Sequence, residues 1–219
     1  MNRCESCVRA IKQMVVSSEG AVIPKEYQQV AWIQGNGAAY IDTGIKPDAQ
    51  TGMESSGEFN GNDNIQGVNI VILGCRYSLN GTNYSLNATS EGTMRFNYGT
   101  RGLTHVVENC TQFSFIPGID MKFRYQREDG TSGNVTIPVK SFNPALNLNF
   151  WLFALNNNGT PSYGTCIVNY FKMYSGTTLT RSFIPCYRKS DSKTGMYDLV
   201  THEFYPVIGT GEFILGPEV

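Results

Sequence analysis

Two carboxylates on one strand are the first candidates for chemistry in this sequence. The segment ESSGE places Glu54 and Glu58 on one face of a predicted strand, with Ser56 between them. Four strand residues separate the two carboxylates by about 13 Å. Retaining or inverting glycoside hydrolysis needs a separation of roughly 5 to 9.5 Å. We therefore expect a solvated polar face here, no catalytic residues, and a protein that is not an enzyme.

The only two histidines, His105 and His202, do not change this expectation. Neither is close to a nucleophile signature such as G-x-S-x-G or C-G-S-C-W. A catalytic triad would have to be assembled from residues that carry no such signature. We predict that both histidines are surface strand or turn residues.

The cysteines are sparse, with six in 219 residues. Cys4-x-x-Cys7 has the spacing of half a zinc site, but no second pair follows at a suitable distance. We favour an apolar stripe that includes both residues, with metal binding and redox or intermolecular disulfide chemistry as alternatives. The remaining four are predicted to be small, reduced core residues: Cys75, Cys110, Cys166 and Cys186.

No cofactor or metal site is predicted. Asp63 and Asn64 in the segment NGNDN are oxygen ligands that calcium could use, but an ordinary polar turn is the favoured interpretation. A structural calcium ion remains an alternative whose ligands the sequence does not locate. Five N-x-[ST] sequons are interpreted as Asn-rich and Thr-rich β composition: Asn80, Asn87, Asn109, Asn134 and Asn158.

A sugar site is the most plausible binding chemistry for this composition. A pyranose has an apolar face and a rim of hydroxyls, so its sites combine an aromatic ring with planar polar side chains. We predict a candidate ligand site from residues on or beside the expected strands: Tyr77, Arg95, Asn97, Trp151 and Asn157. The alternative is core packing for Trp151 and ordinary solvation for the others.

Composition and charge describe the scaffold that must position these residues. Hydrophobic residues make up 41% and charged residues 16%, below the roughly 25% charged residues of average globular proteins. The formal net charge of -1, without a long Lys/Arg run, argues against nucleic-acid binding. No apolar run is long enough to span a membrane, and no secretory signal is visible. We expect synthesis in a cytoplasm.

Alternating patterns predict strands over most of the chain. In IDMKFRYQRE (119–128), Ile119, Met121, Phe123 and Tyr125 alternate with polar residues, and Asp129-Gly130 begins a turn into a returning strand over 134–140. TMRFNYG (93–99) alternates too, whereas LNFWLFAL (148–155) is apolar on both faces and belongs in the middle of a sheet. Further strands are expected over 38–43, 68–75, 82–87, 111–116, 165–174 and 178–187, with turns at 60–64 and 156–162. The predicted core includes Phe96, Met121, Phe123, Tyr125, Phe150 and Phe171.

Residues 3–16 carry the only helical pattern. Apolar residues recur there at spacings of three and four, and they form a stripe of Cys4, Cys7, Val8, Ile11, Met14 and Val15. A lone helix of this length is marginal in water and needs a partner surface. We predict an anchor or oligomerisation segment over 1–24, with the stripe as its assembly interface, and a single β domain over 25–219. A helix folded back on its own domain, or a frayed one, is the alternative.

Four segments carry a family resemblance. They are AYIDTGIKPDAQTGMES, VILGCRYSLNGTNYSL, FWLFALNNNGT and a long C-terminal block. That block runs from Phe171 to the end and includes RSFIPC, RKSD, GMYD and a terminal Gly-Pro-Glu. Over residues 27–219 the chain resembles the concanavalin-A-like, or laminin-G-like, jelly-roll modules of tailed-phage structural proteins and of phage-derived genes in gut bacteria.

The resemblance implies an all-β, two-sheet antiparallel jelly-roll sandwich. It also implies a virion structural protein, such as a fibre, decoration or adhesin subunit of the head or tail, assembled in the host cytoplasm. Such a subunit would display a lectin-like domain toward host-surface glycans or neighbouring subunits. Its expected partners are other virion proteins, further copies of itself and a bacterial surface glycan. The alternatives are a capsid- or tail-stabilising protein without a ligand and a glycan-degrading enzyme.

Overall fold

A computed structural model describes residues 23–59, 70–77, 83–88, 94–104, 109–138 and 147–219. These residues form nineteen strands and no helix, so the described part of the chain is all-β, as predicted. It contains no helix that could cross a membrane. The N-terminal helix and the stripe from Cys4 to Val15 were predicted for residues that lie outside the described ones.

The larger sheet has a continuous run of eight strands. In spatial order they are β10 (Ser132–Thr136), β9 (Lys122–Arg127), β8 (Cys110–Phe115), β4 (Thr51–Glu58), β14 (Ile167–Ser175), β15 (Thr178–Arg188), β16 (Lys193–Asp198) and β17 (Glu203–Pro206). Three short strands join this run: β1 (Tyr27–Gln29) beside β15, β2 (Ile33–Gln34) beside β14, and β19 (Ile214–Leu215) beside β2. All of these pairings are antiparallel.

The smaller sheet is built around β5 (Ile70–Arg76). On one side β5 pairs with β6 (Asn83–Ala88), which pairs with β7 (Met94–Thr104). On its other side β5 pairs with β11 (Trp151–Leu152), which pairs with β3 (Ala39–Asp42), and β3 pairs with β18 (Ile208–Gly209). A hairpin of β12 (Ala154–Asn157) and β13 (Thr160–Tyr163) adds the one parallel pairing of this sheet, β12 with β5.

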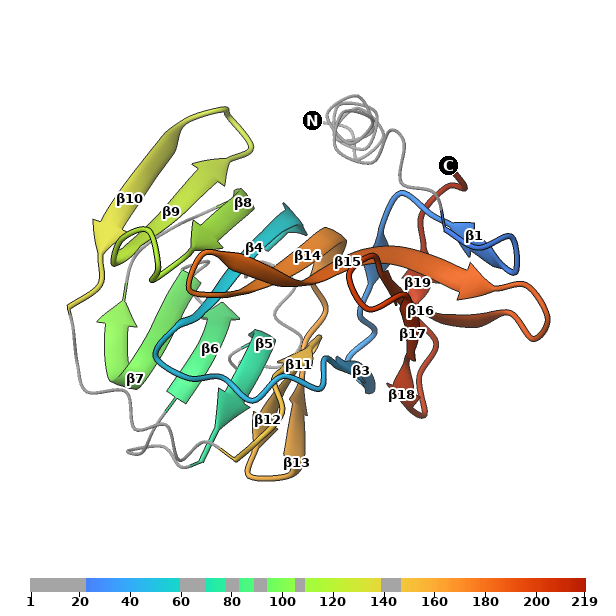
Figure 1. The fold of residues 1–219 in the computed structure, drawn as a ribbon, viewed down its shortest axis with the longest axis horizontal. Helices are drawn as coiled ribbons and strands as arrows, with labels where there is room; N and C mark the ends of the chain where they lie inside the picture. The colour runs from blue at the N-terminus through green and yellow to red at the C-terminus, as the bar shows by residue number, and fades with distance from the viewer. Residues whose placement is uncertain (1–22, 60–69, 78–82, 89–93, 105–108, 139–146) are drawn as a thin grey trace.

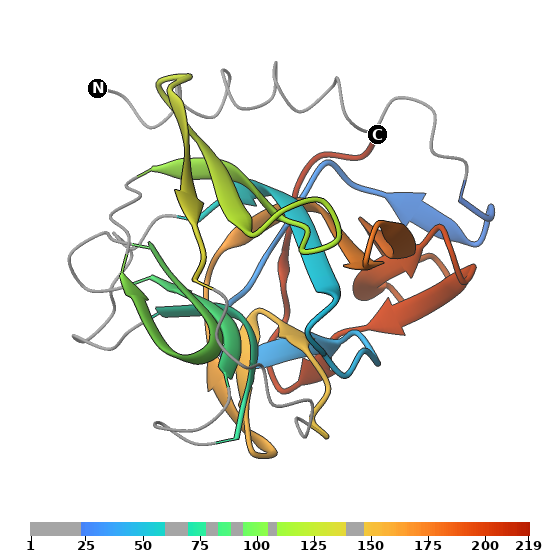
Figure 2. The same cartoon turned by 60° about the vertical axis from the view of Figure 1, so that its left-hand side comes forward.

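The chain passes repeatedly from one sheet to the other, and the core lies between them. At the left of Figure 1, β8, β9 and β10 lie above β5, β6 and β7, and the turned view separates these two layers (Figure 2). Aromatic rings join the layers: Phe96 stacks on Phe123 at 5.1 Å, and Phe150 on Phe171 at 5.9 Å between ring centroids. The fully buried Tyr84 donates its hydroxyl to the Thr51 carbonyl at 2.6 Å. The described residues therefore form a β-sandwich.

A second, smaller apolar cluster lies at the far end of β15. Ile184, Cys186 and Tyr197 are buried there, and Tyr27 stacks on Phe204 at 5.0 Å. In Figure 1 this end of β15 meets β1, β16 and β17 at the right of the molecule. The C-terminus closes the group, because the Val219 amide donates to the Gln29 carbonyl at 3.2 Å. Both ends of the described residues, Ile23 and Val219, are therefore packed against the sheets.

Most predicted strands are present, but several details of the prediction are wrong. Ile119 lies in a turn after Pro117-Gly118 and is 63% exposed, because its strand, β9, begins only at Lys122. Met121 and Tyr125 are partly buried rather than buried, because β9 lies next to the edge strand β10. The returning strand spans Ser132–Thr136 rather than 134–140. The predicted turn over 156–162 is confined to Asn158 and Gly159, between β12 and β13. Phe96, Phe123, Phe150 and Phe171 are buried as predicted.

The doubly apolar segment 148–155 lies in the middle of the smaller sheet, as predicted. It is not one strand, however, because Phe153 has a positive φ of 65° and separates β11 from β12. The bend reverses the chain, so that β11 is antiparallel and β12 parallel to β5. Such a backbone is costly for a bulky residue. The full burial of the Phe153 ring compensates for it.

Candidate functional site

One row of paired residues crosses the smaller sheet on the side away from the core. Asn97 pairs with Ser85, Ser85 with Gly74, Gly74 with Trp151, and Trp151 with Asp42. Directly paired residues project to the same face of a sheet. The flanking row points into the core and consists of Phe96, Leu86, Leu73, Leu152 and Ile41. The first row therefore lies on the outer face.

A second row extends this outer face by two residues along β6 and β7. Asn87 pairs with Arg95 there, and each lies two residues from a member of the first row. Tyr40 lies two residues from Asp42 on β3. We call these residues the polar face: Tyr40, Asp42, Ser85, Asn87, Arg95, Asn97 and Trp151. From β7 to β11 it crosses three strand spacings, about 14 Å.

The tertiary structure brings most of the predicted ligand residues to this face. Arg95, Asn97 and Trp151 are members of it. Asn157 ends β12 opposite Arg76, two residues beyond Gly74, and its Oδ1 accepts a hydrogen bond from Arg76 Nε at 3.2 Å. Tyr77 follows the end of β5 and is 60% exposed. Tyr77 and Asn157 therefore border the polar face at one end of the sheet.

Trp151 is neither a core residue nor a freely exposed platform. Its ring stacks on Tyr40 with centroids 4.0 Å apart and an interplanar angle of 24°. Only 7% of Trp151 is exposed, whereas Tyr40 is half-buried. Burial raises the pKa of Tyr40, and the nearby Asp42 and Tyr163 add to the effect. The accessible ring is thus that of Tyr40, which alternates with Ala39 and Ile41 in a pattern that could have identified it.

Asp42 is held by the backbone and side chains around it. Its Oδ2 accepts from Asn149 Nδ2 at 3.0 Å, and its Oδ1 accepts from the Gly44 amide at 2.9 Å. The Asn149 carbonyl in turn accepts from Asn156 Nδ2 at 2.9 Å. This chain of bonds ties β3 to β12, so Asp42 has a structural role at the border of the Tyr40 and Trp151 pair.

Unpaired polar atoms are concentrated on the polar face. Six buried side-chain nitrogen or oxygen atoms of the described residues lack a hydrogen-bond partner. Four of these atoms belong to this face: Asn87 Oδ1, Arg95 Nε, Asn97 Oδ1 and Trp151 Nε1. A buried polar group without a partner costs about 1 to 3 kcal/mol, and native proteins have few of them. Four of these six atoms lie on the polar face, which makes it the candidate site.

Asn97 illustrates this point. Its Nδ2 donates to Ser85 Oγ at 3.2 Å, which leaves its Oδ1 without a donor. Gly74, next in the row, contributes no side chain between Ser85 and Trp151. Gly74 has a φ of 134°, and an added Cβ would lie 2.5 Å from Ser85 Cα, so no larger residue fits there. Gly74 therefore adds no side chain of its own to the row, and the buried Ser85 side chain lies beside it.

A second polar cluster lies on the outer face of the larger sheet, around Glu54. Its carboxylate accepts from Tyr170 Oη at 3.0 Å, Lys172 Nζ at 3.2 Å and Tyr174 Oη at 3.1 Å. Burial raises the pKa of Tyr174 to about 12, and the Glu54 charge adds to the effect. Glu54, Ser56 and Glu58 share a face as predicted. Glu54 is fully engaged by its three donors, which is what a structural carboxylate requires.

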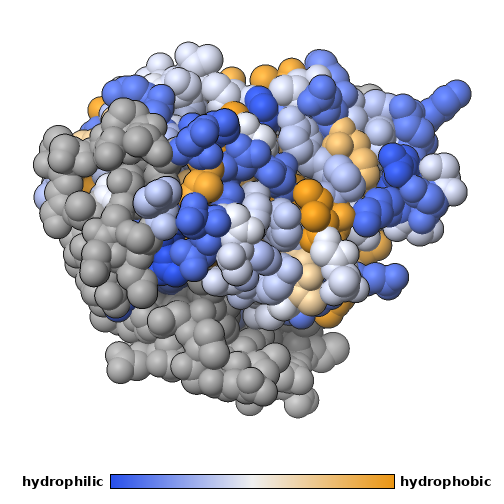
Figure 3. Space-filling model, turned by 90° about the horizontal axis from the view of Figure 1, so that it is seen from below, coloured by the Kyte–Doolittle hydropathy of each residue, from blue (hydrophilic) through white to orange (hydrophobic). Residues whose placement is uncertain are grey.

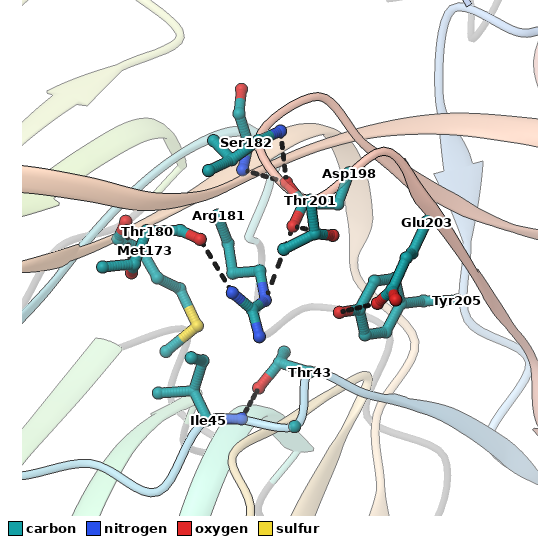
Figure 4. A network of polar contacts seen from close by, with 12 residues as sticks. Thr43, Ile45, Met173, Thr180, Arg181, Ser182, Asp198, Thr201, Glu203 and Tyr205 are labelled. Atoms are coloured by element: carbon teal, nitrogen blue, oxygen red, sulfur yellow. Dashed lines mark hydrogen bonds and ion pairs between the residues drawn. The ribbon is translucent and has the colours of Figure 1, made fainter. Parts of the chain in front are cut away.

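A third network surrounds Asp198 at the end of β16 (Figure 4). Its Oδ1 accepts from the Ser182 amide at 2.7 Å and the Val200 amide at 3.0 Å, and its Oδ2 accepts from Thr201 Oγ1 at 2.8 Å. Arg181 Nε lies 3.5 Å from Oδ2 but lacks the geometry of a hydrogen bond. Asp198 is completely buried. The network joins β15 to the turn before β17, so we assign it to the scaffold.

The remaining candidates add no chemistry within the described residues. Cys75, Cys110, Cys166 and Cys186 are buried free thiols as predicted, and burial raises the pKa of each to about 12. His202 lies exposed in the turn between β16 and β17. No cluster of three metal-ligating side chains occurs among the described residues. Cys4, Cys7, Asp63, Asn64, Asn80 and His105 lie outside them.

Large exposed hydrophobic residues are spread over the described surface. They are Tyr77, Ile119, Leu179, Val200, Ile208, Ile214 and Val219. Seen from below the view of Figure 1, hydrophobic side chains form small separate patches among hydrophilic ones (Figure 3). The polar face is therefore the stronger candidate for a specific site.

No family model, curated protein or solved structure matches the chain.

Proposed function

We propose that this chain is a structural protein of a tailed-phage virion that binds a glycan on the polar face of its smaller sheet. The observation that carries the binding part is the set of four unpaired polar atoms beside the Tyr40 and Trp151 pair. The virion part, including a jelly-roll topology, head or tail placement and self-association, rests on the resemblance of residues 27–219 to phage modules. Repeated passage of the chain between two sheets is compatible with that topology.

The chemistry of the polar face suits a sugar. A hydroxyl is both donor and acceptor, so a pyranose rim can donate to Asn87 Oδ1 and Asn97 Oδ1 and accept from Trp151 Nε1. The half-buried Tyr40 ring offers an apolar surface for the sugar ring. Binding would then remove the cost of the unpaired atoms. The engaged state of Glu54 supports binding without cleavage.

Screening the purified protein against bacterial surface polysaccharides tests this proposal. We expect binding without release of reducing sugar, and we expect Tyr40→Ala to weaken it by tenfold or more. Tyr205→Ala at β17, in the larger sheet, is the control for loss of a tyrosine elsewhere. Absence of binding to every polysaccharide would favour a ligand-free stabilising protein, and release of a cleavage product would favour an enzyme. Either result would contradict the proposal.

A further inference from the structure

Arg95 has no carboxylate partner among the described residues; Arg127 has none either, but its guanidinium donates to Thr131 Oγ1 and Tyr125 Oη. Arg124, Arg181 and Arg188 each lie within ion-pair distance of an aspartate. Among the described residues no carboxylate pairs with Arg95, which is half-buried and whose Nε is unpaired. A partly desolvated guanidinium favours a charged acceptor, because hydrogen bonds between ionised groups are stronger than neutral ones. The missing partner is therefore an anion.

The neighbours of Arg95 limit what that anion is attached to. Asn87 lies directly opposite Arg95 on β6, with Cβ atoms about 5 Å apart, yet Asn87 Oδ1 and Arg95 Nε both lack partners. The adjacent pair leaves Asn97 Oδ1 free as well. Two amide oxygens need hydroxyl donors, whereas the guanidinium needs an acceptor. One molecule that carries both hydroxyls and an anionic group meets all three requirements.

The distance across the face sets the size of this molecule. Trp151 Nε1 needs an acceptor about 14 Å from β7, farther than one sugar ring reaches. Because Gly74 adds no side chain between the two ends, an extended ligand can lie across the row. This inference rests on the proposed glycan binding. We propose that the ligand is an anionic oligosaccharide whose carboxylate or sulfate binds Arg95 and whose next sugar rings reach Trp151 and Tyr40.

Matched acidic and neutral oligosaccharides test this inference with the full chain. The probes are short oligogalacturonates, the same oligomers after carboxyl reduction, and sulfated oligomers of the reduced form, with affinity measured by calorimetry. We expect the acidic oligomers to bind at least tenfold more tightly than the reduced ones. Tighter binding of the sulfated form would also support an anionic ligand and would identify sulfate as the preferred group.

Variants assign the preference to Arg95. Arg95→Gln should lower affinity for the acidic form at least tenfold and leave the neutral form unchanged. Arg95→Lys should recover part of the loss, since it restores the charge but not the planar fork. Arg124→Gln on β9 is the matched control and should change neither affinity. Circular dichroism and thermal unfolding verify that each variant is folded.

Three results would overturn the inference. Equal binding of acidic and neutral oligomers by the natural chain, or an equal loss for both in Arg95→Gln, would refute anion recognition while glycan binding stood. A preference that survives in Arg95→Gln would place the anion elsewhere. If no oligomer and no surface polysaccharide bound at all, the proposed function itself would fail.

Discussion

At the scale of single residues, burial separates side chains that the alternating pattern of IDMKFRYQRE treats alike. Phe123 is buried against Phe96 and Phe113, whereas Ile119 lies exposed in a turn. We expect Phe123→Ala to lower the free energy of unfolding by about 3 to 5 kcal/mol, because it removes buried apolar contacts and leaves a cavity. Ile119→Ala is the control and should change it by less than about 0.5 kcal/mol. Urea unfolding measures both, and similar losses would contradict the described packing.

The four buried thiols make the free energy of unfolding fall as pH rises through the alkaline range. Burial raises the pKa of Cys75, Cys110, Cys166 and Cys186 from 9.0 to about 12. The unfolded thiols lose their protons first, so the stabilisation is complete below pH 9 and is lost as pH rises toward 12. We expect the urea midpoint to fall over this window. Cys166→Ala should reduce the dependence on pH, and a midpoint that stays constant to pH 12 would contradict thiol burial.

At the scale of elements, Asp198 links β15 to the turn before β17, and these two strands do not pair with each other in the sheet. Its carboxylate binds the Ser182 amide on β15 and both the Val200 amide and Thr201 Oγ1 in the turn before β17 (Figure 4). Asp198→Asn removes the counter-charge of Arg181 and places an amide nitrogen among groups that are all donors. Removing one partner of a buried ion pair costs about 3 to 5 kcal/mol. We expect a loss of this size in chemical unfolding.

Two further variants distinguish the network from a general effect of charge. Asp191→Asn removes the exposed partner of Arg188 in the neighbouring hairpin and should have a much smaller effect, because exposed pairs contribute little. Arg181→Met added to Asp198→Asn should recover part of the loss, since the buried charge is then gone. Additive losses in the double variant would show that the two side chains do not act together.

At the scale of the whole molecule, the two sheets and both apolar clusters are built from residues 23–219. Deleting residues 1–22 should therefore leave the β-type circular dichroism and the unfolding midpoint unchanged. If the stripe from Cys4 to Val15 is the assembly element that its pattern predicts, the same deletion lowers the oligomer size in solution. Light scattering measures it, and Ile11→Asp should reproduce the effect. Unchanged assembly in both variants would rule out the anchor.

The sequence alone was sufficient for features that depend on neighbouring residues. Alternation predicted strands over 38–43, 82–87, 165–174 and 178–187, and the structure has them within one or two residues. The doubly apolar segment 148–155 correctly predicted a place inside a sheet. Side chains alternate at every second residue of a strand whatever its partners are, so this information is local. The short strands β1, β2, β18 and β19 were missed, because two or three residues carry no period, and β13, β16 and β17 were missed as well.

Pairing between distant segments was decided only in the tertiary structure. Glu54 meets Lys172 because β4 pairs with β14, and the polar face exists because β7, β6, β5, β11 and β3 are neighbours in one register. A shift of one residue in any of these pairings would turn the affected side chains to the core. The bend at Phe153 and the stacking of Trp151 on Tyr40 likewise depend on contacts across the sheet. Residues such as Arg95 and Trp151 could be chosen by type, but their common face follows from long-range register, which no local pattern encodes.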